Sequence, residues 1–339
     1  MRLNKYEGNP ILKPNPENAW ESLGVLNPGV CLYEDKFYML YRAAGYDEEH
    51  KINLGLAISE DGKNFVRQSE KPYFPSGFYE ADAGGIEDPR IARMGSSYFM
   101  TYASRPYFPG QYWRVDERLA FNTSPNPAPL GAKRNNTVTY LAYTDNMKDF
   151  KKLGRITDSR LDNRDVILFP EKIGDKFVMF SRPLEWVGEK YGCDVPSIWM
   201  NFSDDMLEWN ASESILFAKP EQEWETKKIG AACVPLLCDE GWLFLYHGVG
   251  KKDNIYCVGA MLLDAERPEK ILARTAEPIM RPEFDYETKG FYNGCVFPTS
   301  MIEKGEDLYI YYGAADRYCC LATCKKQELI KHLINNCKR

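Results

Sequence analysis

The sequence predicts an all-β protein, a five-bladed β-propeller followed by a short C-terminal helix. Two observations lead to this prediction. One strand pattern occurs five times along the 339 residues, and each copy is followed by a third segment that alternates as a β-strand does. The 44% of hydrophobic residues can supply a buried core along the whole length, so we expect residues 1–339 to form one domain.

Each copy of the repeat combines an x-Pro pair, a short β run, a polar turn and an aromatic-rich β run, which is typical of a β-hairpin. The hairpins begin near residues 27, 88, 169, 234 and 297. The third segments are INLGLAIS, TVTYLAYT, PSIWMNFS, NIYCVGAMLLD and YCCLATC, and turns such as SEDGKNF lead into a fourth strand. Radial repetition of four-stranded sheets avoids long exposed edges, and a β-sandwich is the alternative.

The C-terminal tail, about residues 325–338, predicts the helix. Its apolar residues Leu329, Ile330, Leu333 and Ile334 recur at helical spacing. We expect this helix to pack against the propeller and to carry no chemistry.

Composition excludes several classes of function. A net charge of -6 argues against a nucleic-acid or anionic-membrane surface, so any anion site must be local. The N-terminus lacks the apolar run of a signal peptide and no segment has the length of a membrane span, so we expect a cytoplasmic protein. The ten cysteines form no paired CxxC set and the three histidines no ligand spacing, so we expect reduced thiols and no metal site.

Asp88 is the strongest candidate for an acid at the propeller axis. The innermost strands line that axis, so residues beside each x-Pro pair should converge there. Asp88 is the only acid directly before one of the five prolines, and it lies between Glu87 and Arg90. The neighbouring carboxylate tends to raise the pKa of Asp88 and the guanidinium to lower it, and either effect could dominate. We predict a general acid, with a turn-capping role before proline as the alternative.

Several residues at related positions of the repeat could bind an anion near this acid. Three of them end the second strands of their hairpins, namely Arg42, Arg182 and His247. Two more precede inner strands, namely Arg164 and Lys228, and the hydroxyl group of Tyr256 could complete the shell. Arginine suits bidentate phosphate contacts and lysine adds a point charge. Each alone could be a surface ion pair, but together they predict an anion pocket.

Short motifs occur in a fixed order between about Asn9 and Cys324: NPIL, YRA, EDPR, NRDVILFPEKI followed by SRP, W-x-x-KKIG, GWLFLYHGV, VGAMLLD, VFP and YYGAAD. In these motifs the chain resembles the glycoside hydrolase 130 family of mannoside phosphorylases and related β-mannosidases. The resemblance implies a five-bladed propeller, the fold that the repeat predicts. It also implies inverting phosphorolysis of a β-mannoside to α-mannose 1-phosphate, with inorganic phosphate as co-substrate and no further cofactor.

Matched motif by motif, the resemblance implies roles for individual residues. The proton donor is Asp88, acting through a relay along a sugar hydroxyl. The implied phosphate-binding residues are Arg164, Arg182, Lys228, His247 and Tyr256. The implied mannosyl contacts are Asn27, Arg42, Glu87 and Asp316. The family's hydrolases replace basic phosphate ligands with carboxylates that activate water, whereas this chain keeps the basic set. A phosphorylase needs no such base, because phosphate is already an anionic nucleophile.

Two other functions remain open at this stage. One is a β-mannosidase of the same fold, with Glu171, Glu225 or another channel acid acting on water. The other is a propeller that binds sugar without catalysis.

The chain departs from the family pattern at AACVP after KKIG and in a long insertion at about residues 106–136. Because loops on a rigid scaffold often carry specificity, we expect the insertion to shape the acceptor subsite or an oligomer contact, unless it is a plain surface excursion. The departures leave linkage and acceptor open, with short β-1,2-mannosides favoured over β-1,4-linked ones. The expected partners are a manno-oligosaccharide and phosphate, and a homo-oligomer is left open.

Overall fold

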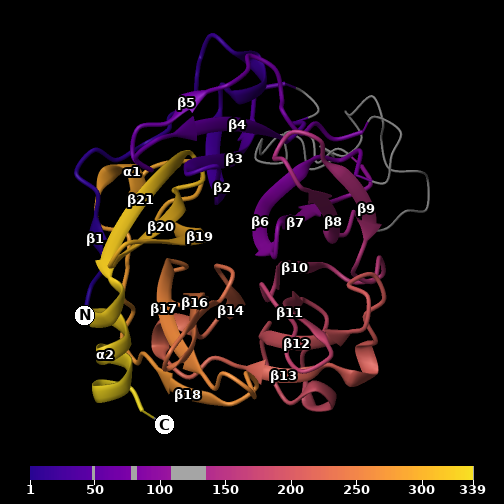
Figure 1. Ribbon diagram of the computed structural model, residues 1–339, viewed down its shortest axis with the longest axis vertical. Coiled ribbons are helices and arrows are strands. Elements are labelled where there is room, and N and C mark those ends of the chain that lie inside the picture. The colour runs from indigo at the N-terminus through magenta and orange to yellow at the C-terminus, as the bar shows by residue number, and fades with distance from the viewer. Residues whose placement is uncertain (48–49, 78–81, 108–134, 339) are drawn as a thin grey trace.

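The computed structural model describes residues 1–47, 50–77, 82–107 and 135–338. Five sheets stand radially around one axis, which confirms the predicted propeller (Figure 1). Most of the insertion at 106–136 lies outside the described residues, so its role stays a prediction. No helix in the described part of the chain is long and apolar enough to span a membrane.

The first three blades consist of strands that follow one another in the chain. Blade 1 contains β2 (Gly24–Tyr33), β3 (Lys36–Ala44), β4 (Asn53–Ser59) and β5 (Val66–Arg67). Blade 2 contains β6 (Ile86–Met94), β7 (Ser97–Ser104), β8 (Val138–Thr144) and β9 (Lys151–Arg155). Blade 3 contains β10 (Asn163–Leu168), β11 (Phe177–Pro183), β12 (Ile198–Ser203) and β13 (Ile215–Ala218).

The last two blades depart from this simple order. Blade 4 contains β14 (Lys228–Ala231), β15 (Leu236–Cys238), β16 (Gly241–Val249), β17 (Tyr256–Leu263) and β18 (Ile271–Arg274), with β14 and β15 both paired to β16. Blade 5 contains β19 (Val296–Lys304), β20 (Asp307–Ala314), β21 (Tyr318–Lys325) and the N-terminal β1 (Asn4–Lys5). The two ends of the chain thus meet in one sheet, and helix α2 (Lys326–Asn336) follows it.

The hairpin predicted near residue 234 is present as β15 and β16, whereas the one predicted near residue 169 starts earlier in the chain, and in neither blade does the x-Pro pair lie on the inner strand. The inner strand of blade 3 begins at Asn163, so Phe169 comes after this strand and Pro170 lies in the turn that follows. The inner strand of blade 4 begins at Lys228, and Pro235 lies between β14 and β15. The x-Pro pair therefore marks the inner strand in three blades but a later position in the other two.

Hydrophobic clusters fill the spaces between neighbouring blades. In the described residues each of the five blade interfaces has such a cluster. Between blades 3 and 4, for example, the Phe180 and Phe244 rings lie 4.5 Å apart. Helix α2 buries Leu329, Ile330 and Leu333, as the spacing predicts. Blade-on-blade packing leaves the inner strands to line the axis.

A bulge redirects one residue of the inner strand in blades 1, 2 and 3. The register shifts at Asn27, Asp88 and Asp165, whose φ angles are 44°, 51° and 54°. Asn and Asp tolerate this left-handed conformation better than most residues, and bulges re-aim side chains next to active sites. The three residues occupy equivalent places in their blades.

A buried acid anchors the segment before the inner strand in four blades. Each acid contacts a tyrosine hydroxyl on the second strand and a cation on the outermost strand: Glu21 with Tyr41 and Arg67, Asp82 with Tyr102 and Lys152, Glu225 with Tyr246 and Arg274, and Glu287 with Tyr312 and Lys5. Buried charges require such partners. These networks hold the chain where it enters the inner strands.

Replacing Glu225 with Ala should destabilise the fold by about 3–5 kcal/mol. Glu225 is fully buried, its Oε2 lies 2.6 Å from Arg274 Nη2, and the variant leaves that guanidinium without its buried partner. Urea unfolding followed by fluorescence measures the change. The control is Glu223→Ala, an exposed neighbour, which should alter stability by less than about 0.5 kcal/mol. Equal stability of both variants would contradict the anchoring role.

Candidate active site

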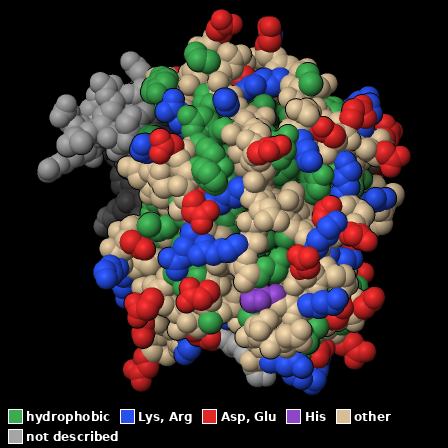
Figure 2. All heavy atoms as spheres, turned by 90° about the vertical axis from the view of Figure 1, so that its left-hand side faces the viewer, with side chains coloured by type: hydrophobic (Ala, Val, Ile, Leu, Met, Phe, Trp, Pro, Cys, Tyr) green, Lys and Arg blue, Asp and Glu red, His purple; other side chains and the backbone are tan. Residues whose placement is uncertain are grey.

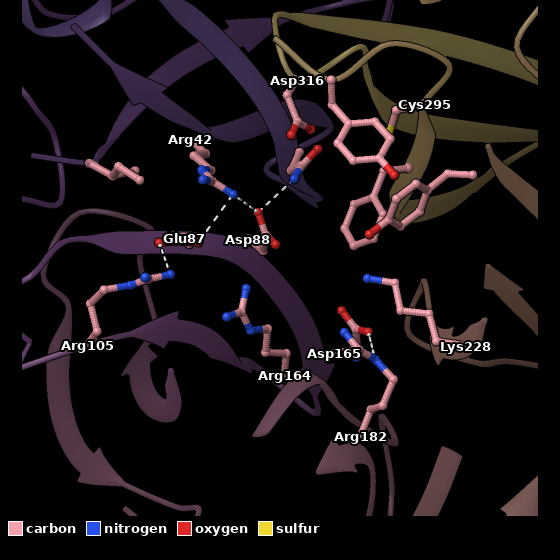
Figure 3. Close-up of a pocket in the computed structure, with 15 residues that line it drawn as sticks. Arg42, Glu87, Asp88, Arg105, Arg164, Asp165, Arg182, Lys228, Cys295 and Asp316 are labelled. Atoms are coloured by element: carbon pink, nitrogen blue, oxygen red, sulfur yellow. Dashed lines mark hydrogen bonds and ion pairs between the residues drawn. The ribbon is translucent and has the colours of Figure 1, made fainter. Parts of the chain in front are cut away.

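A cavity of about 370 Å³ opens where the inner strands meet (Figure 3). This volume lies in the range of small-molecule sites. The lining residues come from all five blades and their loops: Asn27, Arg42, Ile52, Glu87, Asp88, Arg105, Arg164, Asp165, Arg182, Lys228, Tyr256, Tyr292, Cys295, Phe297 and Asp316. Nine of the ten predicted site residues line it.

His247 is the predicted residue that does not line the cavity. It is fully buried on β16 and packs behind the wall, with its ring centroid 4.7 Å from that of Phe297 and 5.6 Å from that of Tyr256. Burial lowers the pKa of His247 to about 3, because the nearby carboxylate of Asp165 offsets only part of that effect. The structure therefore places a neutral imidazole behind the lining residues, where it supports them and does not reach into the cavity.

Asp88 is held by residues of the neighbouring blade. Asn27 Nδ2 donates a hydrogen bond of 2.7 Å to Asp88 Oδ1, and Arg42 Nη1 donates to the same oxygen at 2.9 Å. Among the described residues, both side-chain hydrogen bonds to the Asp88 carboxyl group go to Oδ1 and none goes to Oδ2. The carboxyl group is thus oriented through one oxygen.

Two further acids lie beside Asp88. Burial would raise the pKa of Glu87, yet two arginines hold it at about 2. Arg42 Nη1 lies 3.3 Å from Glu87 Oε2, and Arg105 Nη2 lies 3.1 Å from Glu87 Oε1. Asp316 lies after β20 with a φ of 51°. Burial raises the pKa of Asp316 to about 6, although the charge of Arg42 lowers it, and the carboxylate of Asp88 adds to the rise. This wall of the cavity therefore holds one firmly ionised acid and one that titrates nearer neutrality.

Three cations lie on the side of the cavity opposite Asp88 (Figure 3). Arg164 is held by Asp162 through two hydrogen bonds of 2.7 and 2.9 Å. Arg182 Nε donates to Asp165 Oδ2 at 2.6 Å, while its buried Nη1 has no hydrogen-bond partner among the described residues. These guanidinium groups are positioned to bind an anion with the fork geometry that phosphate favours.

Lys228 completes the cationic side. It is the first residue of β14, and its Nζ lies 4.9 Å from the centre of the Tyr256 ring. In the sheet, Val249 on β16 pairs with Lys228 on one side and with Tyr256 on the other. Burial, reinforced by the charges of Arg182 and Arg164, lowers the pKa of Lys228 to about 7. Its charge therefore depends on pH and on what occupies the cavity.

A family model described as beta-1,4-mannooligosaccharide phosphorylase matches residues 2–335. The chain belongs to glycoside hydrolase family 130. A 1,2-beta-oligomannan phosphorylase and a beta-1,2-mannobiose phosphorylase of Thermoanaerobacter sp. (strain X514) are 32% and 33% identical to it, each over 97% of this chain and 99% of the relative. The solved structure of the Listeria innocua beta-1,2-mannobiose phosphorylase with beta-1,2-mannobiose has a TM-score of 0.78 and 26% identity, covering 98% of this chain and 99% of that one.

The site of this family 130 protein includes two charged residues that the sequence analysis missed. Arg105 lines the cavity, and its signal is present in the repeat, since it ends the run FMTYASR as Arg182 ends its own strand. Asp165 carries no such signal, because the x-Pro pair of the third copy is Phe169 and Pro170, which follow the inner strand. With the bulges superposed, Asp165 is the counterpart of Asp88.

Proposed function

We propose that this family 130 protein cleaves short β-mannosides by inverting phosphorolysis, with β-1,2-mannobiose and longer β-1,2-linked oligomannosides as preferred substrates. The products are α-D-mannose 1-phosphate and a shortened sugar. One observation carries the proposal: an oriented acid, Asp88, and a cluster of three cations face each other across a single cavity (Figure 3).

In the proposed reaction a phosphate oxygen attacks the anomeric carbon of the terminal mannosyl unit as the glycosidic carbon–oxygen bond breaks. The leaving oxygen receives a proton that originates on Asp88, so it departs as a hydroxyl group. Asn27 and Arg42 orient the acid through its Oδ1. Positioning of the two reactants and compensation of charge are the effects that this arrangement can supply.

The cations suit phosphate because their charges and hydrogen-bond donors converge. Arg164 and Arg182 offer planar forks, and Lys228 offers a compact charge. Attack from this side leaves the acid on the opposite side of the anomeric carbon, which agrees with inversion.

Phosphorolysis is better supported than hydrolysis. A hydrolase needs a carboxylate free to activate water. Glu171 is exposed in the turn after β10 and Glu225 is bound to Arg274, so neither lines the cavity. Asp165 does line it, but the adjacent Arg182 overcomes the effect of burial and holds the pKa of Asp165 well below its usual range, which makes it a weak base. Glu87 and Asp316 also line the cavity, but they lie beside Asp88 and not on the opposite side, where a water would have to attack (Figure 3).

The preference for β-1,2 linkages draws on the relatives. Two proteins at 32% and 33% identity over nearly the full chain are named for β-1,2-linked substrates, while the family model is described by a β-1,4 activity. The full-length similarity favours the β-1,2 assignment for this chain.

Incubation with β-1,2-mannobiose in the presence and absence of phosphate tests the proposal. We expect mannose 1-phosphate and mannose in equal amounts with phosphate, and no cleavage without it. Release of mannose alone in phosphate-free buffer would establish a hydrolase instead. A parallel incubation with β-1,4-mannobiose tests the linkage, and faster turnover of that substrate would reverse our assignment.

The affinity for phosphate should depend on pH through Lys228. Since the pKa of Lys228 is lowered to about 7, its ammonium is charged below that pH and loses its charge as the pH rises through it. Between about pH 6 and about pH 8, the ratio of the native KM for phosphate to the KM of Lys228→Arg should rise about tenfold, because the guanidinium of the variant stays charged. The ionisation of phosphate affects both proteins equally and therefore cancels in this ratio. Parallel pH profiles for the two proteins would contradict the role of Lys228.

A further inference from the structure

A carboxylate lies within the cation cluster. Asp165 is buried, lines the same cavity as Arg164, Arg182 and Lys228, and points toward it in Figure 3. Asp165 orients Arg182 through one oxygen, but Asp162 orients Arg164 without lining the cavity, and a negative charge at the cavity wall disfavours an anion because like charges in contact repel strongly when desolvated. The position of Asp165 therefore calls for a chemical reason.

The two oxygens of Asp165 have different surroundings. Oδ2 accepts the hydrogen bond from Arg182 Nε at 2.6 Å and lies 3.4 Å from His247 Nε2. Oδ1 has no hydrogen-bond partner among the described residues. Burial opposes ionisation of Asp165, but Arg182 holds its pKa well below the usual range, so the group is a carboxylate that can only accept hydrogen bonds.

Asp165 is also held rigidly. It occupies the bulge of β10 in a left-handed conformation, and a Cβ on Gly230 of the next blade would lie only 2.2 Å from its Oδ2. The main chain of β14 therefore packs directly against this carboxylate. A side chain so confined presents its remaining acceptor to the cavity in one orientation.

Resting on the proposed function, we propose that Asp165 accepts a hydrogen bond from the protonated oxygen of bound phosphate, and that it thereby selects oxyanions that carry a proton over those that do not. Near neutral pH phosphate and arsenate carry at least one hydroxyl group, whereas sulfate carries none. Phosphate can donate to Asp165 while its other oxygens accept from the cations. Sulfate of similar shape and charge would set an oxygen lone pair against the carboxylate, which costs affinity.

Direct binding to the native protein is the first test. Isothermal titration with phosphate, arsenate and sulfate at neutral pH should give similar affinities for the first two and an affinity about 100-fold weaker for sulfate. Sulfate binding as tightly as phosphate would overturn the proposal, even if phosphorolysis itself were observed. A protein that binds neither phosphate nor arsenate would overturn the phosphate pocket and the proposed function together.

The variant Asp165→Asn is the second test. Its amide oxygen can still accept from Arg182, while its NH₂ group can donate to an anion that lacks a proton. We expect the sulfate affinity to rise so that the 100-fold preference for phosphate falls to about tenfold or less. An unchanged ratio of the two affinities in a folded variant would overturn the assignment.

Asp162→Asn is the matched control. Like Asp165→Asn, it removes one negative charge from this segment and changes the partner of an arginine of the cluster, because Asp162 binds Arg164. Unlike Asp165, Asp162 does not line the cavity. A general electrostatic effect would strengthen the binding of both anions in this control and leave their ratio unchanged. If Asp162→Asn changed the ratio as much as Asp165→Asn, the selectivity would be electrostatic and the proposed hydrogen bond would be rejected.

Discussion

Replacement of Asp88 by Asn should lower kcat for phosphorolysis of β-1,2-mannobiose by about 10³-fold, because the leaving oxygen loses its source of a proton. The variant retains an oxygen that can accept from Asn27 Nδ2 and Arg42 Nη1, so the geometry of the cavity should persist. Release of mannose 1-phosphate measures the rate, and thermal unfolding verifies the fold.

A donor with a good leaving group separates proton donation from other roles of Asp88. β-Mannosyl fluoride needs little protonation, so the variant should recover much of its lost rate with this substrate. Asp175→Asn, an exposed change of the same kind after β10, serves as the control and should leave kcat unaltered. Full activity of Asp88→Asn on mannobiose would mean that another group supplies the proton, and inactivity of the native protein would favour a propeller that only binds sugar.

Replacement of Arg164 by Ala should raise the KM for phosphate by about 100-fold while changing the KM for mannobiose far less. The variant removes one of two guanidinium forks from the cation cluster, and hydrogen bonds between charged groups are the strong ones. Initial rates at varied phosphate and saturating mannobiose measure the effect.

Arg160→Ala is the control for the Arg164 variant. Arg160 pairs with Asp158 as Arg164 pairs with Asp162, but its side chain is 86% exposed and does not line the cavity. It should therefore leave the KM for phosphate unchanged. If Arg164→Ala kept the native KM for phosphate, Arg164 would not be a phosphate ligand.

The repeat in the sequence predicted the number of blades but not the place of every inner strand. Alternation and turn residues are local signals, so the hairpins could be recognised from neighbouring residues alone. The functional position on the inner strand is the left-handed residue of the bulge, and proline follows it only at Asn27 and Asp88. In blade 3 valine follows Asp165, and alignment on proline therefore passed over that residue.

The sequence alone determined the chemical types available for function, namely an acid in EDPR and a set of arginines, a lysine and a tyrosine at the strand ends. Only the tertiary structure decided how they act, because each environment is made by residues from several blades. His247 and Arg182 both end second strands, yet packing buries the first behind the wall and directs the second to the cavity. Burial, together with the charges of arginines that lie far away in the sequence, likewise lowers the pKa of Lys228 to about 7. The fold also places Asp165 among the cations, and we propose that this one carboxylate distinguishes one anion from another.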